Sequence, residues 1–511
     1  MKKHQKVIYG GYFLLAAVAI MFLATRSSIL YPCNNWDDAN SYFSVGKALF
    51  HGKMPYRDVF DQKGMYLYFF YGLCYLISHT TFRGVFLMEI LLAFFDLAGI
   101  FYILKFYVKE STALILTPLS LAVCFCSYSF YYGGAAEEIC FPFLIWGLYL
   151  GIRYFKEGEP GTGMKKSTLF VAGLLAGMVA NIKFTVLGFF FAWMMMVAFS
   201  YLARKDFWGA VKACGWFLLG MLLPFVPWFF YFAIRGGLYY WYWGYVYINV
   251  FSYSNLNGAG PSLGERVYTL AKILYYIILK NWIYYIFLIP GFFYGSIAVQ
   301  PREKKQKTKK WLSVFFVPSL AFFLFLGIYI GGSELPYYAL PLGVFTVFGF
   351  ALLGRLAERL LPSFFSKTGA CVAAMTASVM VSMLVIWCFS MNIPFRNVKQ
   401  EDIFLYQFRD VVMQTENPTL LNVGCLDAGL YTVCDIVPTC QWFQTQTIHM
   451  QEVYDEQKRY IKEGLIDYVI ARDGEPEKIH DRYELASEAV FEENGYPHVW
   501  YLYRLKEKGK S

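Results

Sequence analysis

The stretch NNWDDANSYF, residues 34–43, places two adjacent carboxylates, Asp37 and Asp38, directly after the first long apolar run of the chain. That run, near residues 7–28, is long enough to cross the roughly 30 Å hydrocarbon core of a bilayer as a helix. The two acids therefore stand where hydrocarbon should end and water begin. What they do there depends on how the remaining apolar runs are arranged.

Composition indicates an integral membrane protein. Of 511 residues, 58% are hydrophobic, 21% are aromatic and only 16% are charged, and the mean hydropathy is +0.41. Soluble globular domains are less apolar than this. The formal net charge of +9 does not indicate a nucleic-acid partner, because the basic residues form short clusters between apolar runs instead of one patch.

The basic clusters predict the orientation, since cytoplasmic loops are enriched in Lys and Arg. With the segment MKKHQK placed inside, all strong clusters fall on one side of the membrane. This predicts an α-helical polytopic protein with about eleven transmembrane helices, a cytoplasmic N-terminus and a first outer loop over 29–83. The predicted spans lie near 7–28, 84–107, 112–130, 139–155, two between 168 and 203, 213–233, 281–299, 311–331, 336–354 and 370–391.

From about residue 392 the charges become frequent and the apolar runs shorten to strand length. We expect a membrane domain over 1–391 and a small extracytoplasmic α/β domain over 392–511. Strand-like runs occupy 419–425, 465–471 and 498–505, and helical spacing occurs in 401–414, 448–464 and 483–493. A disulfide among Cys425, Cys434 and Cys440 is left open.

The first outer loop contains a helix of its own. Its apolar residues recur at helical spacing, with Lys47 on the opposite side. They are Ala39, Tyr42, Phe43, Gly46, Leu49 and Phe50. We expect a helix that lies in the plane of the membrane interface, with the acidic pair at its N-terminal end.

The loop continues as HGKMPYRDVFDQKG, residues 51–64. An acidic pair after the first span, a short helix that ends in this pattern and a multi-span body with an outer C-terminal domain resemble the superfamily-C glycosyltransferases. These include the dolichyl-phosphate-mannose protein mannosyltransferases and the lipid A aminoarabinose transferases. The match is most specific over 31–72, extends to about residue 200 and is architectural beyond that. The resemblance implies an enzyme that moves a sugar from a polyprenyl-phosphate carrier to an acceptor hydroxyl at the outer face.

Such a transfer needs a base that takes the acceptor proton, and a carboxylate held at the water–lipid boundary supplies one. We predict that Asp37 is this catalytic base and that Asp38 is its structural partner. The alternative is that either acid is the N-cap of the loop helix, a frequent role for Asp.

Negative charge that grows on the departing phosphate requires fixed cations nearby. The candidates for the donor phosphate are Lys63, Arg57 and Lys183. Lys183 interrupts an apolar run, where a charge without a function is costly. Contact with lipid headgroups is the alternative for Arg57 and Lys63, and Asp58 and Asp61 then serve as their ion-pair partners.

Further acids and aromatic residues in the outer loops are also candidates. Glu137 and Glu138 begin a span, where the helix dipole favours acids whatever their function. In the related oligosaccharyltransferases an acid of this second loop joins a metal site, so the two could complete one. A divalent cation is therefore the one cofactor that the resemblance suggests, and the sequence leaves open whether the protein needs it. The segment GGSELPYYALPLG contains Glu334, Tyr337 and Tyr338. Comparable Tyr-Pro segments line the donor site in the family, so the resemblance makes these three residues candidates for lining the donor site.

Two other functions compete with the transferase. A transporter or flippase predicts broken helices with midplane charges in two corresponding halves, and a noncatalytic scaffold of an envelope assembly needs none of the acids. The expected partners of the enzyme are a polyprenyl-phosphate sugar, a glycan, lipid or protein acceptor, and membrane lipids. Few cysteines and short loops favour a bacterial plasma membrane. The sugar, the acceptor and the oligomeric state leave no mark in the sequence.

Overall fold

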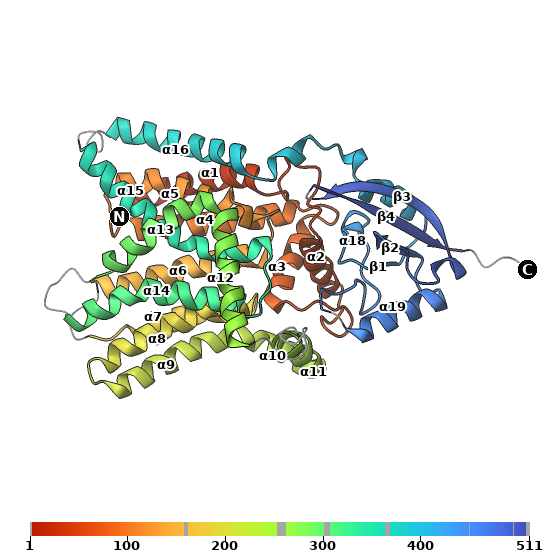
Figure 1. Ribbon diagram of the computed structural model, residues 1–511, viewed down its shortest axis with the longest axis horizontal. Coiled ribbons are helices and arrows are strands. Elements are labelled where there is room, and N and C mark those ends of the chain that lie inside the picture. Colours follow the sequence, from red (N-terminus) through yellow and green to blue (C-terminus); the bar gives the residue numbers. More distant parts are fainter. Residues whose placement is uncertain are drawn as a thin grey trace, which may run out of the picture. The chain divides into compact units, whose positions relative to one another are not determined.

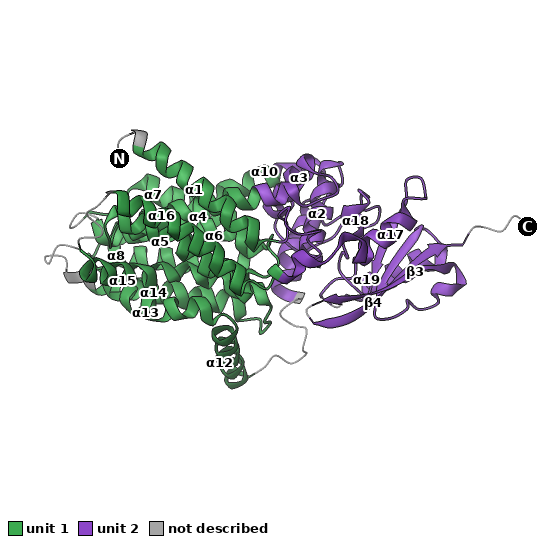
Figure 2. Ribbon diagram, turned by 90° about the horizontal axis from the view of Figure 1, so that it is seen from above, with its two compact units in different colours: residues 1–25, 88–229, 261–393 green, residues 26–87, 230–260, 394–511 purple. Residues whose placement is uncertain are grey.

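The computed structural model describes residues 3–157, 162–252, 262–300, 307–362, 368–448, 450–493 and 495–506. The chain forms two compact units, coloured separately in Figure 2. Unit 1 comprises Met1–Thr25, Met88–Phe229 and Pro261–Ile393, and unit 2 comprises Arg26–Leu87, Phe230–Gly260 and Pro394–Ser511. The polar segments used for the orientation extend into 158–161 and 301–306, outside the described residues.

Unit 1 is built from helices, because long apolar runs in lipid must satisfy their own backbone groups. Helices α6, α7, α8, α9 and α14 pack side by side within it (Figure 1). The α-helices that lie wholly or partly in unit 1 are α1 Lys3–Ala24, α4 Arg83–Leu104, α5 Glu110–Phe125, α6 Ala136–Glu157, α7 Lys166–Ala180, α8 Gly188–Leu202, α9 Phe207–Leu222, α10 Val226–Ile234, α12 Leu263–Lys280, α13 Trp282–Ala298, α14 Lys307–Tyr329, α15 Thr346–Leu360 and α16 Thr368–Phe389.

The protein is a multi-pass membrane protein. Among the described residues, eight helical segments are long and apolar enough to cross a bilayer, and a ninth crossing is counted if α12 and α13, bent by 114°, form one span. The sequence predicts about eleven spans. The difference lies in α5 and α7, which are helical as predicted but have only 16 and 15 residues, fewer than the roughly 20 that a straight crossing needs.

Unit 2 is organised around the helix predicted in the first outer loop. This is α2, Asp37–Phe50, and eleven of its fourteen residues are buried. It crosses α3, Met65–Ile77, at two glycines. A Cβ on Gly46 would lie 2.6 Å from the backbone nitrogen of Gly72, and one on Gly72 would lie 2.3 Å from the Phe50 ring, so this close crossing requires glycine at both positions.

Lys47, on the side of this helix opposite the apolar residues, is not exposed to solvent. Its side chain is fully buried, and the ammonium forms an ion pair with Asp435 at 3.0 Å. It also donates hydrogen bonds to the carbonyls of Tyr431 and Ile436. The amphipathic pattern fails as a guide to exposure here because the C-terminal segment of the chain covers the polar side of α2.

Other polar side chains of α2 continue this contact. Asn40 accepts a hydrogen bond from the Thr432 hydroxyl at 2.8 Å, and the hydroxyl of Ser41 donates to Gln444 at 2.6 Å. The loop and the C-terminal segment thus share one core within unit 2. The predicted domains, 1–391 and 392–511, remain a prediction, since compactness assigns no function to either part.

The C-terminal segment is the small mixed α/β domain that the sequence predicts. Its four-stranded sheet has the order β1-β2-β4-β3. Strands β1 and β2 are parallel, with Leu420 opposite Tyr468, and the other two pairings are antiparallel. The elements of unit 2 outside the first loop are α11 Leu238–Trp241, a π-helix Tyr242–Ser252, α17 Phe404–Val412, β1 Leu420–Val423, α18 Leu430–Val433, α19 Gln451–Glu463, β2 Tyr468–Arg472, β3 Tyr483–Glu493 and β4 Tyr496–Leu505.

Two details differ from the sequence-based expectations. Residues 483–493, expected as a helix, form β3, which pairs with β4 over its whole length. Pairing with β4, the next strand in the chain, overrides the helical preference of a segment rich in Glu and Ala. The three cysteines Cys425, Cys434 and Cys440 are buried free thiols, so the disulfide left open by the sequence is not formed.

The buried ammonium yields a test of this core. We expect Asp435→Asn to destabilise the protein by about 3 kcal/mol, because it leaves the Lys47 charge without its counter-ion. The measurement is thermal unfolding of the full-length protein in detergent. His79→Gln is the matched control, since His79 contacts the same carboxylate at 3.5 Å but is 55% exposed, and it should change stability by no more than about 0.5 kcal/mol. Equal effects of the two variants would contradict the ion-pair account.

Candidate functional site

Asp37 and Asp38 occupy the first turn of α2, but neither is its N-cap. The cap is Trp36, which makes no side-chain capping bond, and its N–H donates to the side-chain oxygen of Asn34 at 3.1 Å. The Oδ1 atom of Asp37 accepts the backbone N–H of Asp38 at 2.8 Å. Neither Asp37 nor Asp38 therefore has the N-cap role that the sequence offered as the alternative.

The environment of Asp37 raises its affinity for a proton. Its side chain is half-buried, and desolvation, followed by repulsion from Asp38, raises the pKa of Asp37 to about 7. Arg472 opposes this rise and Glu493 adds to it. A carboxyl group with a pKa near neutrality changes its charge in the range where a general base works best.

A third acid, Asp61, and a lysine, Lys63, belong to the same neighbourhood. Asp61 is buried, and burial raises its pKa while the positive charge of Lys63 opposes the rise and that of Asp38 adds to it. The Tyr68 hydroxyl donates to Asp61 at 2.9 Å. The ammonium of Lys63 lies 5.7 Å from the centre of the Tyr42 ring on α2. We call Asp37, Asp38, Asp61 and Lys63 the acid cluster.

Arg57 is held differently. Its guanidinium forms two hydrogen bonds with the carboxylate of the next residue, Asp58, at 2.7 and 3.0 Å. The same carboxylate accepts the N–H of Met54 at 2.7 Å, and these bonds lower the pKa of Asp58. This is the pairing with a neighbouring cation that the sequence suggests for Asp58.

The C-terminal sheet adds charged residues that the sequence reasoning missed. Strand β2 ends at Arg472, whose guanidinium lies 3.9 Å from the Glu493 carboxylate, and both charges act on Asp37. Asp427 follows β1, accepts the Ser44 hydroxyl at 2.5 Å, and has a pKa raised to about 6 by burial. A signal existed, because the carboxyl ends of parallel strands meet at one edge of a sheet and often carry functional side chains.

Unit 1 contains a separate polar cluster, and the sequence predicted all of its members. The ammonium of Lys183, at the break between α7 and α8, forms an ion pair with Glu137 in the first turn of α6. It also lies 3.9 Å from the ring centre of Tyr338 and 5.2 Å from that of Tyr337. Three segments far apart in the sequence therefore meet at one buried lysine.

The remaining predicted residues of unit 1 have other partners. Glu138 accepts the backbone N–H of Gly134 at 2.8 Å, which is the helix-start role considered for it. Glu334 pairs with Lys280 at 3.0 Å, and the lysine is 46% exposed. Among the residues that the structure describes, no three His, Cys, Asp or Glu side chains gather where one metal ion could bind them.

Comparison with solved structures identifies proteins of similar fold. No family model matches the chain, and no curated protein matches it. The chain superposes on the crystal structure of ArnT from Cupriavidus metallidurans bound to undecaprenyl phosphate with a TM-score of 0.59, at 12% identity and over 98% of each chain. The apo structure of the same protein gives the same values. The resemblance to this group of membrane glycosyltransferases is thus confirmed at the level of the fold.

The ion pair of unit 1 is open to a mutational test. We expect Lys183→Met and Glu137→Met to destabilise the protein singly by roughly 3–5 kcal/mol, because each leaves a buried charge without its partner. The double variant should recover most of this loss. Thermal unfolding in detergent is the measurement, and Lys280→Met, in the exposed pair with Glu334, should cost no more than about 1 kcal/mol. Additive losses in the double variant would show that the two charges do not stabilise each other.

Proposed function

We propose that this protein is a glycosyltransferase that moves a sugar from a polyprenyl-phosphate carrier to an acceptor hydroxyl. The observation that carries the proposal is the acid cluster, in which Asp37 has a pKa of about 7 at the start of a buried helix. The fold supports it, because the chain resembles an ArnT structure that contains a polyprenyl phosphate. The acceptor class comprises glycans, lipids and proteins of the cell envelope.

Asp37 acts as the general base in this proposal. The acceptor hydroxyl gives its proton to the Asp37 carboxylate while its oxygen forms a bond to the anomeric carbon of the sugar. The bond between that carbon and the phosphate oxygen breaks, and polyprenyl monophosphate leaves with the electron pair. Asp38 keeps the pKa of Asp37 high by repulsion, which makes Asp37 a stronger base.

Lys63 is the proposed partner of the departing phosphate in unit 2. Its ammonium acts on Asp61 and lies near the Tyr42 ring, so it belongs to the same neighbourhood as the base. A fixed cation stabilises charge that develops in the transition state without reorganising. Lys183 and Arg57 remain proposed phosphate ligands, although each now has a carboxylate partner that a phosphate would have to replace.

We also propose a topology and a membrane for this protein. The N-terminus is cytoplasmic, the C-terminal α/β domain is extracytoplasmic, and the membrane is a bacterial plasma membrane. The role of the C-terminal domain is to hold α2 and to supply Arg472 and Glu493, which set the charge around the base. A transporter or a scaffold with this fold would need neither the base nor that tuning.

The replacement Asp37→Asn tests the base directly. We expect it to lower sugar transfer roughly 10²–10⁴-fold, because the amide cannot take the proton but can still accept the Asp38 N–H. The assay offers the purified protein in lipid a panel of polyprenyl-phosphate sugars and measures product. Asp455→Asn, at an exposed position of α19, is the control. Full activity of Asp37→Asn would refute the assignment.

The pH dependence of transfer gives a second test. Asp37 must be deprotonated to act as a base, so kcat/KM should fall as the pH drops below about 7. Arg472→Gln removes a charge that stabilises the carboxylate and should move the profile to higher pH. Glu493→Gln should move it to lower pH.

Matched controls come from the same sheet. Arg504 and Glu484 form an exposed ion pair at 2.7 Å, and Arg504→Gln and Glu484→Gln should leave the profile in place. Shifts of equal size in all four variants would indicate a general charge effect and would contradict a local action on Asp37.

A further inference from the structure

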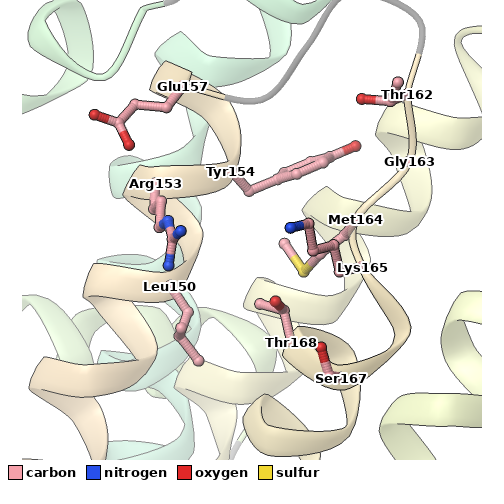
Figure 3. A pocket seen from close by; sticks show the side chains of 10 residues that line it. All are labelled: Leu150, Arg153, Tyr154, Glu157, Thr162, Gly163, Met164, Lys165, Ser167 and Thr168. Atoms are coloured by element: carbon pink, nitrogen blue, oxygen red, sulfur yellow. The ribbon is translucent and has the colours of Figure 1, made fainter.

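Unit 1 contains a polar cavity that the proposed reaction does not use. It has a volume of about 590 Å³ and lies between the C-terminal end of α6 and the N-terminal end of α7 (Figure 3). Arg153, Tyr154 and Glu157 line it from α6, and Lys165, Ser167 and Thr168 line it from the start of α7. Two cations, one carboxylate and the hydroxyls of Tyr154, Thr162, Ser167 and Thr168 thus line one cavity.

The cavity lies at the membrane end opposite to Lys183 and its partner. Glu137 is in the first turn of α6 and Glu157 is its last residue, so at 1.5 Å per residue the two ends are about 30 Å apart. This distance matches the hydrocarbon thickness of a bilayer. The cavity is therefore at the level of the headgroups of the leaflet that lies farther from Glu137.

Aromatic side chains support this level. Helix α9 packs beside α7 and starts at the same end of unit 1, and its first residues, Phe207 and Trp208, are 60% and 70% exposed. Exposed aromatic residues at helix ends mark the membrane–water interface. A cavity at this level lies within reach of lipid headgroups.

We propose that this cavity binds the phosphodiester headgroup of an anionic glycerophospholipid. Arg153 and Lys165 supply the charge and the donors for the phosphate oxygens, and the Ser167 and Thr168 hydroxyls add further donors. Among the described residues of the lining, two positive charges, Arg153 and Lys165, face one negative charge, Glu157, and this balance favours a singly charged anion over a zwitterionic headgroup. This site is independent of the sugar transfer proposed above.

The test is native mass spectrometry of the full-length protein titrated with phosphatidylglycerol. The double variant Arg153→Gln/Lys165→Gln should weaken the first binding event roughly tenfold or more. The matched control is Lys166→Gln/Lys212→Gln, which removes the same charge from positions outside the cavity lining, where Lys166 lies 5.6 Å from the Trp216 ring. The control should bind within about twofold of the unmodified protein. The charge-conserving variant Arg153→Lys/Lys165→Arg should retain binding, which separates loss of charge from loss of fold.

Several outcomes would overturn the proposal. Unchanged phosphatidylglycerol binding in Arg153→Gln/Lys165→Gln, or equal weakening in the control, would exclude this cavity as the site. Equally tight binding of phosphatidylethanolamine would overturn the anionic assignment. Displacement of the lipid by millimolar inorganic phosphate would assign the cavity to a soluble phosphate instead of a lipid.

Discussion

The buried ion pair between Lys47 and Asp435 is the constraint on which the candidate site depends. A charged ammonium inside a protein is tolerated only where charges and carbonyl groups compensate it. Here the C-terminal segment supplies the Asp435 carboxylate and the carbonyls of Tyr431 and Ile436. The hydrogen bonds of Asn40 and Ser41 follow the same helix toward its start. They fix the first turn of α2, and with it Asp37.

Because Asp37 is held in place, its neighbours determine its pKa. Desolvation and Asp38 raise its pKa, and Arg472 restrains the rise, so the acid is neither fully ionised nor fully protonated near neutral pH. These charges come from the loop after the first span and from a sheet more than four hundred residues later in the chain. The C-terminal domain thus has a chemical role in the account, in addition to its structural one.

The sequence predicted the parts that local patterns determine. Each apolar run predicted as a span contains a helix in the structure, including the short helices α5 and α7. The helical spacing of apolar residues from Ala39 to Phe50 correctly predicted α2. Patterns could not reveal contacts between distant segments. The burial of Lys47 was not predicted because its partners lie near residue 435. Residues 483–493 were assigned as a helix because their composition favours one, although their pairing partner β4 begins close by in the chain, at Tyr496. Arg472 and Glu493 were missed because they lie far from Asp37 in the chain. Lys183 was a candidate because a charge stands out within an apolar run, and Glu137, Tyr337 and Tyr338 were candidates through the family resemblance. The structure brings these four residues together.

The central claim is that a carboxylate held at the start of α2 activates a hydroxyl for attack on the sugar carbon of a lipid-linked donor. An isotope experiment addresses this bond directly. The donor is a polyprenyl-phosphate sugar in which the oxygen between phosphorus and the anomeric carbon is ¹⁸O. It is incubated with the protein and an acceptor, and mass spectrometry measures the ¹⁸O content of each product. The account predicts that the label leaves with the polyprenyl phosphate. Label retained in the sugar product would mean attack at phosphorus and would contradict the account.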